Sequence, residues 1–231
     1  MTRPRDDGDD QQRRVRSFVR RPGRLTPGQR RALEALLPRY RIAPDLTDLR
    51  VAFARDAPLV VEIGFGNGEA LATMAAAEPD RNFVGVEVHE PGVGRLLKRL
   101  DEHDTDNVRV AMRDAVEVLG EQAARASIDA LRVFFPDPWP KKRHHKRRLV
   151  QPDFVELVAD RLRDGGLLHL ATDWEPYAER MVDVLAGQEA LECLGDPFVP
   201  RPAWRPQTHF EARGARQGHR IHDLLYRRRA R

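Results

Sequence analysis

The 231-residue sequence has one cysteine, Cys193, only four lysines, and no apolar run near the roughly 20 residues that a membrane span needs. A single cysteine excludes a disulfide framework and a cysteine-based zinc cluster, so we expect a cytoplasmic protein. No cysteine or carboxylate lies at ligand spacing from the histidines, and we expect no metal site. Residues 1–24 hold eight Arg and four Asp without an apolar core, which fits neither a secretory signal nor an acid-poor transit peptide.

The basic residues are almost all arginine: 36 of the 40, for a net charge of only +4. Arginine binds phosphate bidentately and stacks on bases, which suggests a nucleic-acid partner. Genomic base composition also enriches arginine, and it explains the scattered residues. We interpret three clusters, at residues 13–24, 141–148 and 227–231, as functional.

The chain divides into a basic arm and one domain. Residues 1–24 contain too few apolar side chains to offset the entropy of ordering, and we expect a flexible, disordered arm. Residues 25–231 form the predicted domain. It begins with Thr26, Pro27 and Gln29 in the pattern of a capped helix, which we expect to end near Pro38.

From residue 58 onward, β-branched runs alternate with helical periodicity. This pattern predicts an α/β fold with a doubly wound, mostly parallel sheet. The expected strands are residues 59–63, 82–88, 108–110, 131–135 and 167–171, a sixth near Cys193, which we place in the core, and a seventh at 221–226. The expected helices are residues 68–77, 91–104, 115–125, 152–163 and 174–187, with a proline-rich loop after residue 196.

The first strand-to-helix turn carries Gly64, Gly66 and Gly68, and such turns bind ligands at the carboxyl edge of an open sheet. A dinucleotide fingerprint requires its third glycine at position 69, where this chain has Glu69. The carboxylate of Glu69 would repel a pyrophosphate bound at this turn. The turn therefore suits a nucleoside-like ligand without phosphates.

Carboxylates end three successive strands. Glu87 stands where such folds bind ribose hydroxyls, Asp114 follows the third strand near an adenine amino group, and Glu62 precedes the glycine turn, where it can accept from an ammonium group. Together they fit S-adenosyl-L-methionine. The alternative for each is a solvated carboxylate or, for Asp114, a helix cap.

A second candidate segment follows the fourth strand. Three prolines surround Asp137 in Phe134-Phe135-Pro136-Asp137-Pro138-Trp139-Pro140, and they restrict the backbone that carries this carboxylate. The basic residues 141–148 come next; they are either a solvated helix start or a set of phosphate contacts beside the chemistry.

These segments, with Thr172-Asp173-Trp174 and Thr208-His209-Phe210-Glu211, resemble the bacterial tRNA (guanine-N7-)-methyltransferase family across residues 15–228. The resemblance implies a Rossmann-like class I methyltransferase fold with a seven-stranded sheet, and methylation of guanosine 46 in the variable loop of tRNA. It implies that Glu62, Glu87, Asp114 and Asp137 contact S-adenosylmethionine and that Asp137 is catalytic. Substrate would be bound by Lys141, Asp173, Thr208, His209, Phe210 and Glu211. His209 departs from the family, in which we expect lysine more often.

The residues also suggest how the reaction proceeds. Guanine N7 has a lone pair and no proton, so methyl transfer needs alignment rather than a general base. We expect Asp137 to organise the site, and Asp173 and Glu211, which show no local partner in the sequence, to read the guanine edge. The alternatives are methylation of another RNA, a non-catalytic RNA-binding protein, and a nicotinamide-dependent oxidoreductase, which the missing glycine at 69 disfavours. We expect a monomer or a weak homodimer.

Overall fold

The computed structural model describes residues 17–18, 24–216 and 218–231, without the side chains of His209, Phe210 and Ala215. Apart from Ser17, Phe18 and Arg24, the predicted basic arm lies outside the described residues. Among the described residues, no helix is both long and apolar enough to cross a membrane.

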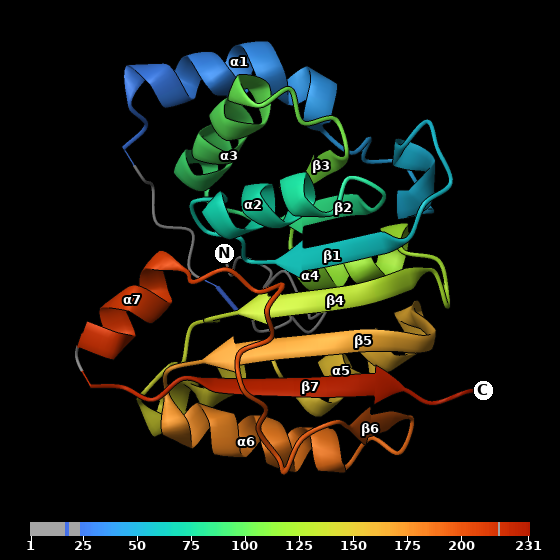
Figure 1. Ribbon diagram of the computed structural model, residues 1–231, viewed down its shortest axis with the longest axis vertical. Helices are drawn as coiled ribbons and strands as arrows, with labels where there is room; N and C mark the ends of the chain where they lie inside the picture. Colours follow the sequence, from blue (N-terminus) through green and yellow to red (C-terminus); the bar gives the residue numbers. More distant parts are fainter. Residues whose placement is uncertain (1–16, 19–23, 217) are drawn as a thin grey trace, which may run out of the picture.

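The core of the molecule is one seven-stranded sheet in the order β3-β2-β1-β4-β5-β7-β6 (Figure 1). Its strands are β1 (Leu59–Ile63), β2 (Asn82–Val86), β3 (Val108–Ala111), β4 (Ile128–Phe134), β5 (Leu162–Thr172), β6 (Leu191–Cys193) and β7 (His222–Arg228). Strands β1 to β5 pair in parallel, and β7 runs antiparallel between β5 and β6. The strand order reverses between β1 and β4, which is where open α/β sheets bind ligands.

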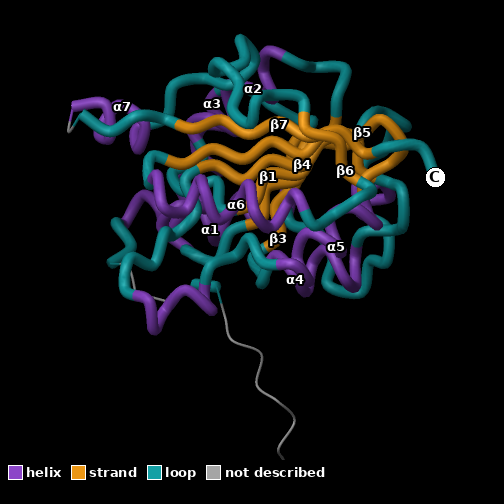
Figure 2. The backbone as a smooth tube through the Cα atoms, turned by 90° about the horizontal axis from the view of Figure 1, so that it is seen from below, coloured by secondary structure: helices purple, strands orange, loops and turns teal. Residues whose placement is uncertain are grey.

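Helices cover both faces of the sheet because β1, β2 and β4 are apolar on both faces (Figure 2). One core cluster joins Val60 and Phe83 to α1 (Pro27–Tyr40), α2 (Glu69–Ala77) and α3 (Glu90–Glu102). The other joins Val61 and Val84 to the opposite layer, which comprises α4 (Ala115–Glu117), the π-helical turn Val118–Gln122, α5 (Pro152–Arg161) and α6 (Glu175–Ala186). Short 3-10 helices lie at Leu49–Ala52 and Lys142–Arg147, and α7 (His209–Arg216) lies in the figure beside the carboxyl ends of β4 and β5.

The predicted doubly wound sheet is confirmed, and five local predictions are wrong. The helix expected at residues 115–125 is instead the three-residue α4 followed by the π-helical turn Val118–Gln122, and the chain is extended at Ala123. The first helix continues past Pro38 to Tyr40, because a proline in the last turn removes only one helical bond. The helix expected to reach residue 163 ends at Arg161, where β5 begins. Cys193 is exposed on edge strand β6 rather than buried in the core. The proline-rich loop contains α7, which the sequence analysis did not predict.

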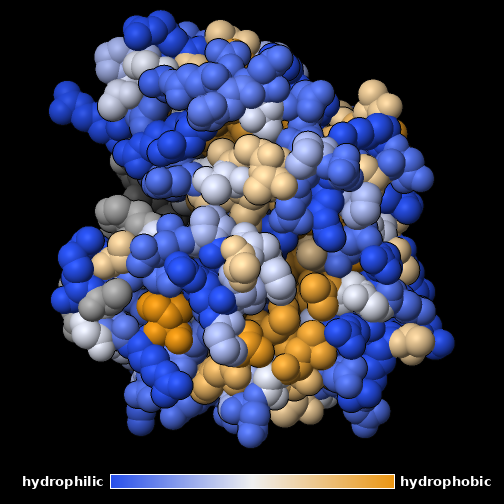
Figure 3. Space-filling model, in the orientation of Figure 1, coloured by the Kyte–Doolittle hydropathy of each residue, from blue (hydrophilic) through white to orange (hydrophobic). Residues whose placement is uncertain are grey.

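The molecular surface is uneven in polarity on the face shown in Figure 3. Hydrophilic residues dominate over α1 and α3, and apolar patches lie lower, over the region of β5 and β7. Leu167 and Leu225 of these two strands are partly exposed, and Trp204 in the loop crossing the strands is 41% exposed.

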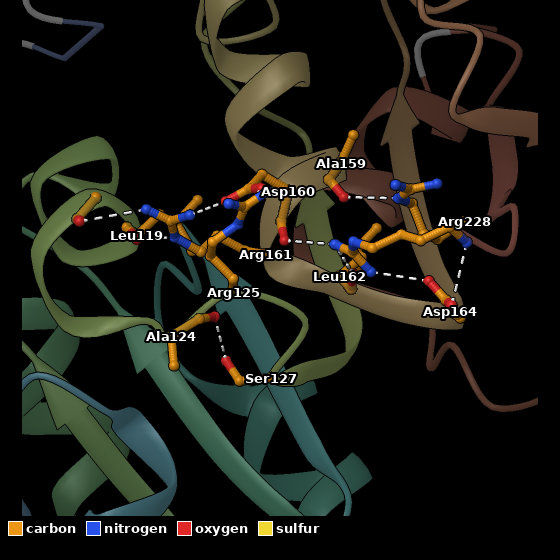
Figure 4. A network of polar contacts seen from close by, with 12 residues as sticks. Leu119, Ala124, Arg125, Ser127, Ala159, Asp160, Arg161, Leu162, Asp164 and Arg228 are labelled. Carbon is orange, nitrogen blue, oxygen red and sulfur yellow. Dashed lines mark hydrogen bonds and ion pairs between the residues drawn. The ribbon is translucent and has the colours of Figure 1, made fainter.

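The amino ends of β4 and β5 are held by a polar network far from α7 (Figure 4). Asp160 pairs with Arg161 and, at 2.8 Å, with Arg125. Arg228 donates to the Ala159 carbonyl at 2.8 Å, and Arg231 pairs with Asp164 at 2.8 Å. Arg228 and Arg231, two arginines of the 227–231 cluster, therefore make structural contacts.

Candidate active site

A cavity of about 220 Å³ opens at the carboxyl ends of β1, β2 and β4. The sequence-predicted residues that line it are Gly64, Gly66, Glu87 and Asp137. Its apolar walls include Ile63, Val86, Val88, Val133, Phe134, Phe135 and Leu149. Ser17 and Phe18 also line it, so a short described part of the N-terminal segment reaches the site.

The glycine turn needs its glycines because Gly64, Gly66 and Gly68 all have φ between +59° and +74°. Neighbouring glycines allow the turn to pack tightly. A Cβ on Gly92 of α3 would lie 2.1 Å from the Gly66 carbonyl oxygen, and one on Gly85 would lie 2.7 Å from the buried Phe65 ring. The backbone therefore takes this shape only with small residues around it.

Glu87 accepts hydrogen bonds from three backbone N–H groups. One oxygen accepts from Gly66 at 3.0 Å, and the other accepts from Val88 at 2.7 Å and His89 at 3.0 Å. The carboxylate thus ties the glycine turn to the end of β2. It also presents its remaining acceptor sites to the cavity that it lines.

Glu62 is 2% exposed, and its Oε2 has no hydrogen-bond partner within the described part of the chain. Burial raises the pKa of this carboxyl to about 7, against the opposing effect of Arg132, and Glu87 raises it further. A buried carboxylate without a partner is costly. Glu62 is not among the residues that line the cavity, although the next two residues, Ile63 and Gly64, are. An ammonium group that reached its free acceptor would remove that cost, so this acceptor suits the amino-acid end of S-adenosylmethionine.

Asp114 caps a helix, as the alternative interpretation stated. Its Oδ1 accepts from the Val116 N–H at 2.9 Å and starts α4. The cavity is lined by its neighbours Arg113 and Ala115 rather than by Asp114 itself. One carboxylate oxygen beyond the cap bond is left to meet a ligand at the rim. Gly68, for its part, caps α2 beneath the turn.

The loop carrying Asp137 has a strained backbone. Phe135 and Trp139 have φ of +52° and +44°, a region that non-glycine residues rarely occupy. The Phe135 N–H donates to the Ala171 carbonyl at 2.7 Å, and the buried Arg148 donates to the Pro138 carbonyl at 2.8 Å. These bonds and three prolines fix an exposed carboxylate at the cavity.

Trp139 is half-buried and has three side-chain or backbone neighbours. Its Nε1 donates to the Ser17 carbonyl at 3.2 Å, the Arg147 guanidinium lies 5.1 Å from its ring centroid, and the His144 ring meets its edge. The indole therefore joins the N-terminal segment to the basic residues that follow the loop.

The basic residues 141–148 separate into two groups. Arg148 is 4% exposed and stacks on Tyr177, so its role is structural. Four cations are exposed to solvent beside the loop of Asp137, and these are Lys141, Lys142, Arg143 and Lys146. These four cations form a positively charged surface next to the cavity, as the sequence predicted.

Asp173 and Glu211 both have partners, which corrects the sequence-based expectation. Asp173 is 31% exposed and lies 3.4 Å from His219 Nδ1. Glu211 is buried and pairs with Arg205 at 2.5 Å and with Arg201 at 3.4 Å. Thr208 accepts from the Glu211 N–H at 3.0 Å and caps α7. The Thr-x-x-Glu spacing is a capping signature that could have predicted α7.

Two predicted substrate residues, His209 and Phe210, lie in α7, but their side chains are outside the described residues. Within the described residues, no group of three histidine, cysteine or acidic side chains is arranged to hold a metal ion. The residue that sequence analysis missed is Arg205, which carries no motif among 36 arginines.

The chain matches known methyltransferases in sequence and fold. A family model described as a putative methyltransferase matches residues 56–224. An rRNA methylase from Streptococcus thermophilus aligns with a TM-score of 0.50 and 16% identity over 75% of this chain and 88% of that one. An O-methyltransferase from Thermotoga maritima gives 0.51 and 15% identity over 77% and 61%. These structural likenesses show the fold alone. The fold and the family match define a methyltransferase with a Rossmann-like sheet.

Closer relatives identify the family. The tRNA (guanine-N(7)-)-methyltransferase of Halorhodospira halophila is 54% identical over 222 residues, covering 94% of this chain and 96% of that protein. Its namesake in Alkalilimnicola ehrlichii is 54% identical and covers 97% of both chains. The chain belongs to the tRNA (guanine-N(7)-)-methyltransferase family.

Proposed function

We propose that the protein transfers a methyl group from S-adenosyl-L-methionine to N7 of guanosine 46 in the variable loop of tRNA. One observation carries the proposal: the loop of residues 135–141 joins the cavity, through Asp137, to the exposed cations that begin at Lys141. Family membership supplies the substrate class. The proposal assumes a cytoplasmic enzyme acting as a monomer or a weak homodimer.

The cavity suits the cofactor through three kinds of group. Glu62, which precedes the lining residues Ile63 and Gly64 in the chain, offers a buried acceptor to an ammonium group, and Glu87, which lines the cavity, offers acceptors to ribose hydroxyls. Val86, Val88 and Leu149 provide apolar walls for a purine. Asp114 stands at the rim for an adenine amino group. Exposed Glu69 begins α2, where a dinucleotide would place its pyrophosphate, and this disfavours a nicotinamide cofactor.

The sulfonium of the bound cofactor supplies the methyl group. Because N7 carries a lone pair and no proton, the protein has no proton to remove and acts by aligning the reactants. Positive charge develops on the purine during transfer, and the fixed carboxylate of Asp137 stabilises it. The strained, proline-flanked backbone keeps that carboxylate in place before substrate arrives.

We assign the exposed cations at residues 141–146 to tRNA phosphates. Asp173 is 31% exposed although it lies 3.4 Å from His219, and we assign it to the N1–H and amino group of guanine, because Arg205 and Arg201 engage Glu211. The cap formed by Thr208 sets the start of α7, with His209 and Phe210 placed by the resemblance at the substrate. The target base must leave its stack to reach the cavity, as base-modifying enzymes generally require.

Labelled S-adenosylmethionine and unmodified tRNA provide the test. Nucleoside analysis should show label in N7-methylguanosine, mapped to position 46. A matched tRNA with 7-deazaguanosine at this position keeps the pairing edge and lacks the nucleophile, so it should bind equally and accept no label there. Label in another nucleoside, or label at position 46 in the deaza tRNA, contradicts the proposal.

A further inference from the structure

Arg205 lies between β6 and α7 and is the largest fully buried side chain of the described residues. Its side chain is 0% exposed, and burying a guanidinium is costly unless its charge and N–H groups are matched. The groups that match the charge and the N–H groups of this guanidinium come from parts of the molecule that are far apart in sequence.

Three side-chain bonds satisfy the guanidinium. Its Nε and Nη2 donate to the two oxygens of Asp223 in β7 at 2.7 and 2.8 Å. Its Nη1 donates to Glu211 in α7 at 2.5 Å. Nε2 of His169 in β5 lies 2.7 Å from Asp223 Oδ1, the oxygen that accepts from Arg205 Nε. Bonds from His169 and Arg205 keep the pKa of Asp223 below its usual value although burial alone would raise it, so this carboxylate is charged.

The same guanidinium contacts the strand that leads to Asp137. It lies 5.7 Å from the ring centroid of Phe134 and 5.9 Å from that of Phe135. Both aromatic residues line the cavity, and Phe135 has the positive φ at which the strained loop begins. One buried cation thus touches β7, α7 and the base of the Asp137 loop.

The far end of α7 is held separately. A Cβ on Gly214 would lie 2.9 Å from Asp173 Oδ2, so the helix packs directly on the segment after β5. His219, just beyond α7, faces the same Asp173 oxygen at 3.4 Å. Arg205 at the first turn and Asp173 near the last turn therefore fix both ends of the helix.

The charges in this cluster make Arg205 essential to its geometry. Glu211 and Asp223 are both buried, with 9% and 3% of their side chains exposed, and Arg205 is the fully buried cation between them. Arg201 reaches only Glu211, at 3.4 Å, and is 45% exposed. Without the guanidinium fork, two buried carboxylates would face each other, and α7 would be pushed from β7.

The geometry points to Arg205 as a positioning residue that sets α7 and the Phe135–Asp137 loop in one fixed arrangement, so that the tRNA-binding and methyl-transfer parts of the site meet the same nucleotide. This role rests on the proposed function for its substrate. Arg205 does not line the cavity beside Asp137 and its side chain is fully buried, so it acts through Glu211 and the two phenylalanines.

Arg205→Lys keeps the charge and removes the planar fork, because one ammonium cannot bind both Asp223 oxygens and Glu211 in this geometry. We expect the KM for tRNA to rise at least fivefold and kcat to fall, while the dissociation constant of S-adenosylmethionine changes less than twofold. Hydrogen exchange of the α7 amides should accelerate. The matched control is Arg161→Lys, a structural arginine at the opposite end of the sheet, which should lower stability without either effect.

Asp223→Asn is the second variant, in case Arg205→Lys does not fold. Asp223 is 3% exposed and does not line the cavity beside Asp137, and asparagine keeps its volume. Because it loosens the anchor of Arg205, it should reproduce the rise in the tRNA KM and the faster exchange of α7. Unchanged tRNA kinetics and unchanged α7 exchange in a folded variant of either kind overturn the inference.

The two proposals fail in different ways. If the wild-type enzyme puts no methyl group on tRNA, the proposed function is wrong, whereas the exchange rates of α7 in Arg205→Lys and Arg161→Lys still decide whether Arg205 positions the helix. If the wild type methylates tRNA and both lysine variants lose only stability, Arg205 is a structural residue and the function stands.

Discussion

A buried carboxylate oxygen without a hydrogen-bond partner indicates a place where a ligand can supply the missing donor. Glu62 is such a residue at the end of β1, and Gly66, Gly85 and Gly92 show how closely the backbone packs around the same site. The sequence identified Glu62 and the glycine turn because both occur in a recognisable pattern after a strand. It left open whether Asp114 caps a helix, because the hydrogen bond from the Val116 N–H to Asp114 Oδ1 depends on the backbone of α4.

Glu62→Gln should change how stability depends on pH. The unfolded carboxyl loses its proton near its ordinary pKa of 4.5, whereas the folded one keeps it until about 7. The folded state therefore binds more protons between these values, and this group makes stability fall as pH rises, by on the order of 3 kcal/mol. Glutamine removes that fall. Urea unfolding without cofactor should show similar stability at pH 5 and a more stable variant at pH 8; equal pH profiles contradict this.

Gly92→Ala should weaken cofactor binding while leaving the fold intact. Its Cβ would lie 2.1 Å from the Gly66 carbonyl, so the glycine turn must move, at the overpacking cost of about 1–3 kcal/mol. Calorimetry should show affinity for S-adenosylmethionine falling about tenfold or more. Gly28→Ala in α1, where nothing lies within 4 Å of the new Cβ, is the matched control and should leave affinity unchanged.

Among the elements, those with strong periodicity were predicted and those set by long-range contacts were not. The apolar runs of β1 and β2 and the periodic α3 and α6 appear where the sequence placed them. Helix α7 was missed because prolines before it suggested a loop, and its stability depends on a salt bridge from Glu211 to Arg205 that no local pattern reveals.

The 3-10 helix Lys142–Arg147 and its flanking Lys141 give a prediction for tRNA binding. Lys141→Ala combined with Lys142→Ala removes two exposed cations beside Asp137. Because log affinity falls with log salt by roughly 0.7–0.9 per phosphate contact, the slope should flatten by about 1–2. Filter binding across a salt series measures it.

The matched control removes the same charge at the other end of the sheet. Arg227 and Arg229 are exposed at the end of β7, and alanine at both positions should leave the slope unchanged. Equal flattening by the two pairs would mean that tRNA affinity follows total charge rather than the surface beside the cavity.

Across the whole molecule, the two ends of the sheet have different tasks. The amino ends of β4 and β5 carry a network in which Asp160 pairs with Arg161 and Arg228 donates to the Ala159 carbonyl (Figure 4). The carboxyl ends carry the cavity, positive φ angles at two non-glycine residues, and an exposed catalytic candidate in Asp137. Positive φ also occurs at Asp104 and Ala126, shortly before β3 and β4, so the carboxyl ends are set apart by the cavity and the exposed carboxylate rather than by backbone strain alone.

This division predicts opposite outcomes for two alanine variants. Asp160→Ala removes the partner of Arg125 and Arg161, and the free energy of unfolding should fall by about 1–3 kcal/mol. Its cofactor affinity and turnover below the unfolding range should match the wild type. Asp137→Ala removes a carboxylate from a loop whose backbone is held by prolines and by Arg148, so the variant should still fold while turnover on tRNA falls at least a hundredfold.

Denaturant titrations and single-turnover methylation of unmodified tRNA, measured on both proteins, provide the comparison. Because the free energy of unfolding and the turnover are measured separately, the comparison shows whether a variant loses one of them or both. If fully folded Asp160→Ala lost turnover, the amino ends of the strands would be coupled to the site. If Asp137→Ala folded and methylated tRNA at the wild-type rate, alignment by the cavity and α7 would suffice, and the developing charge on the purine would need no carboxylate from this loop.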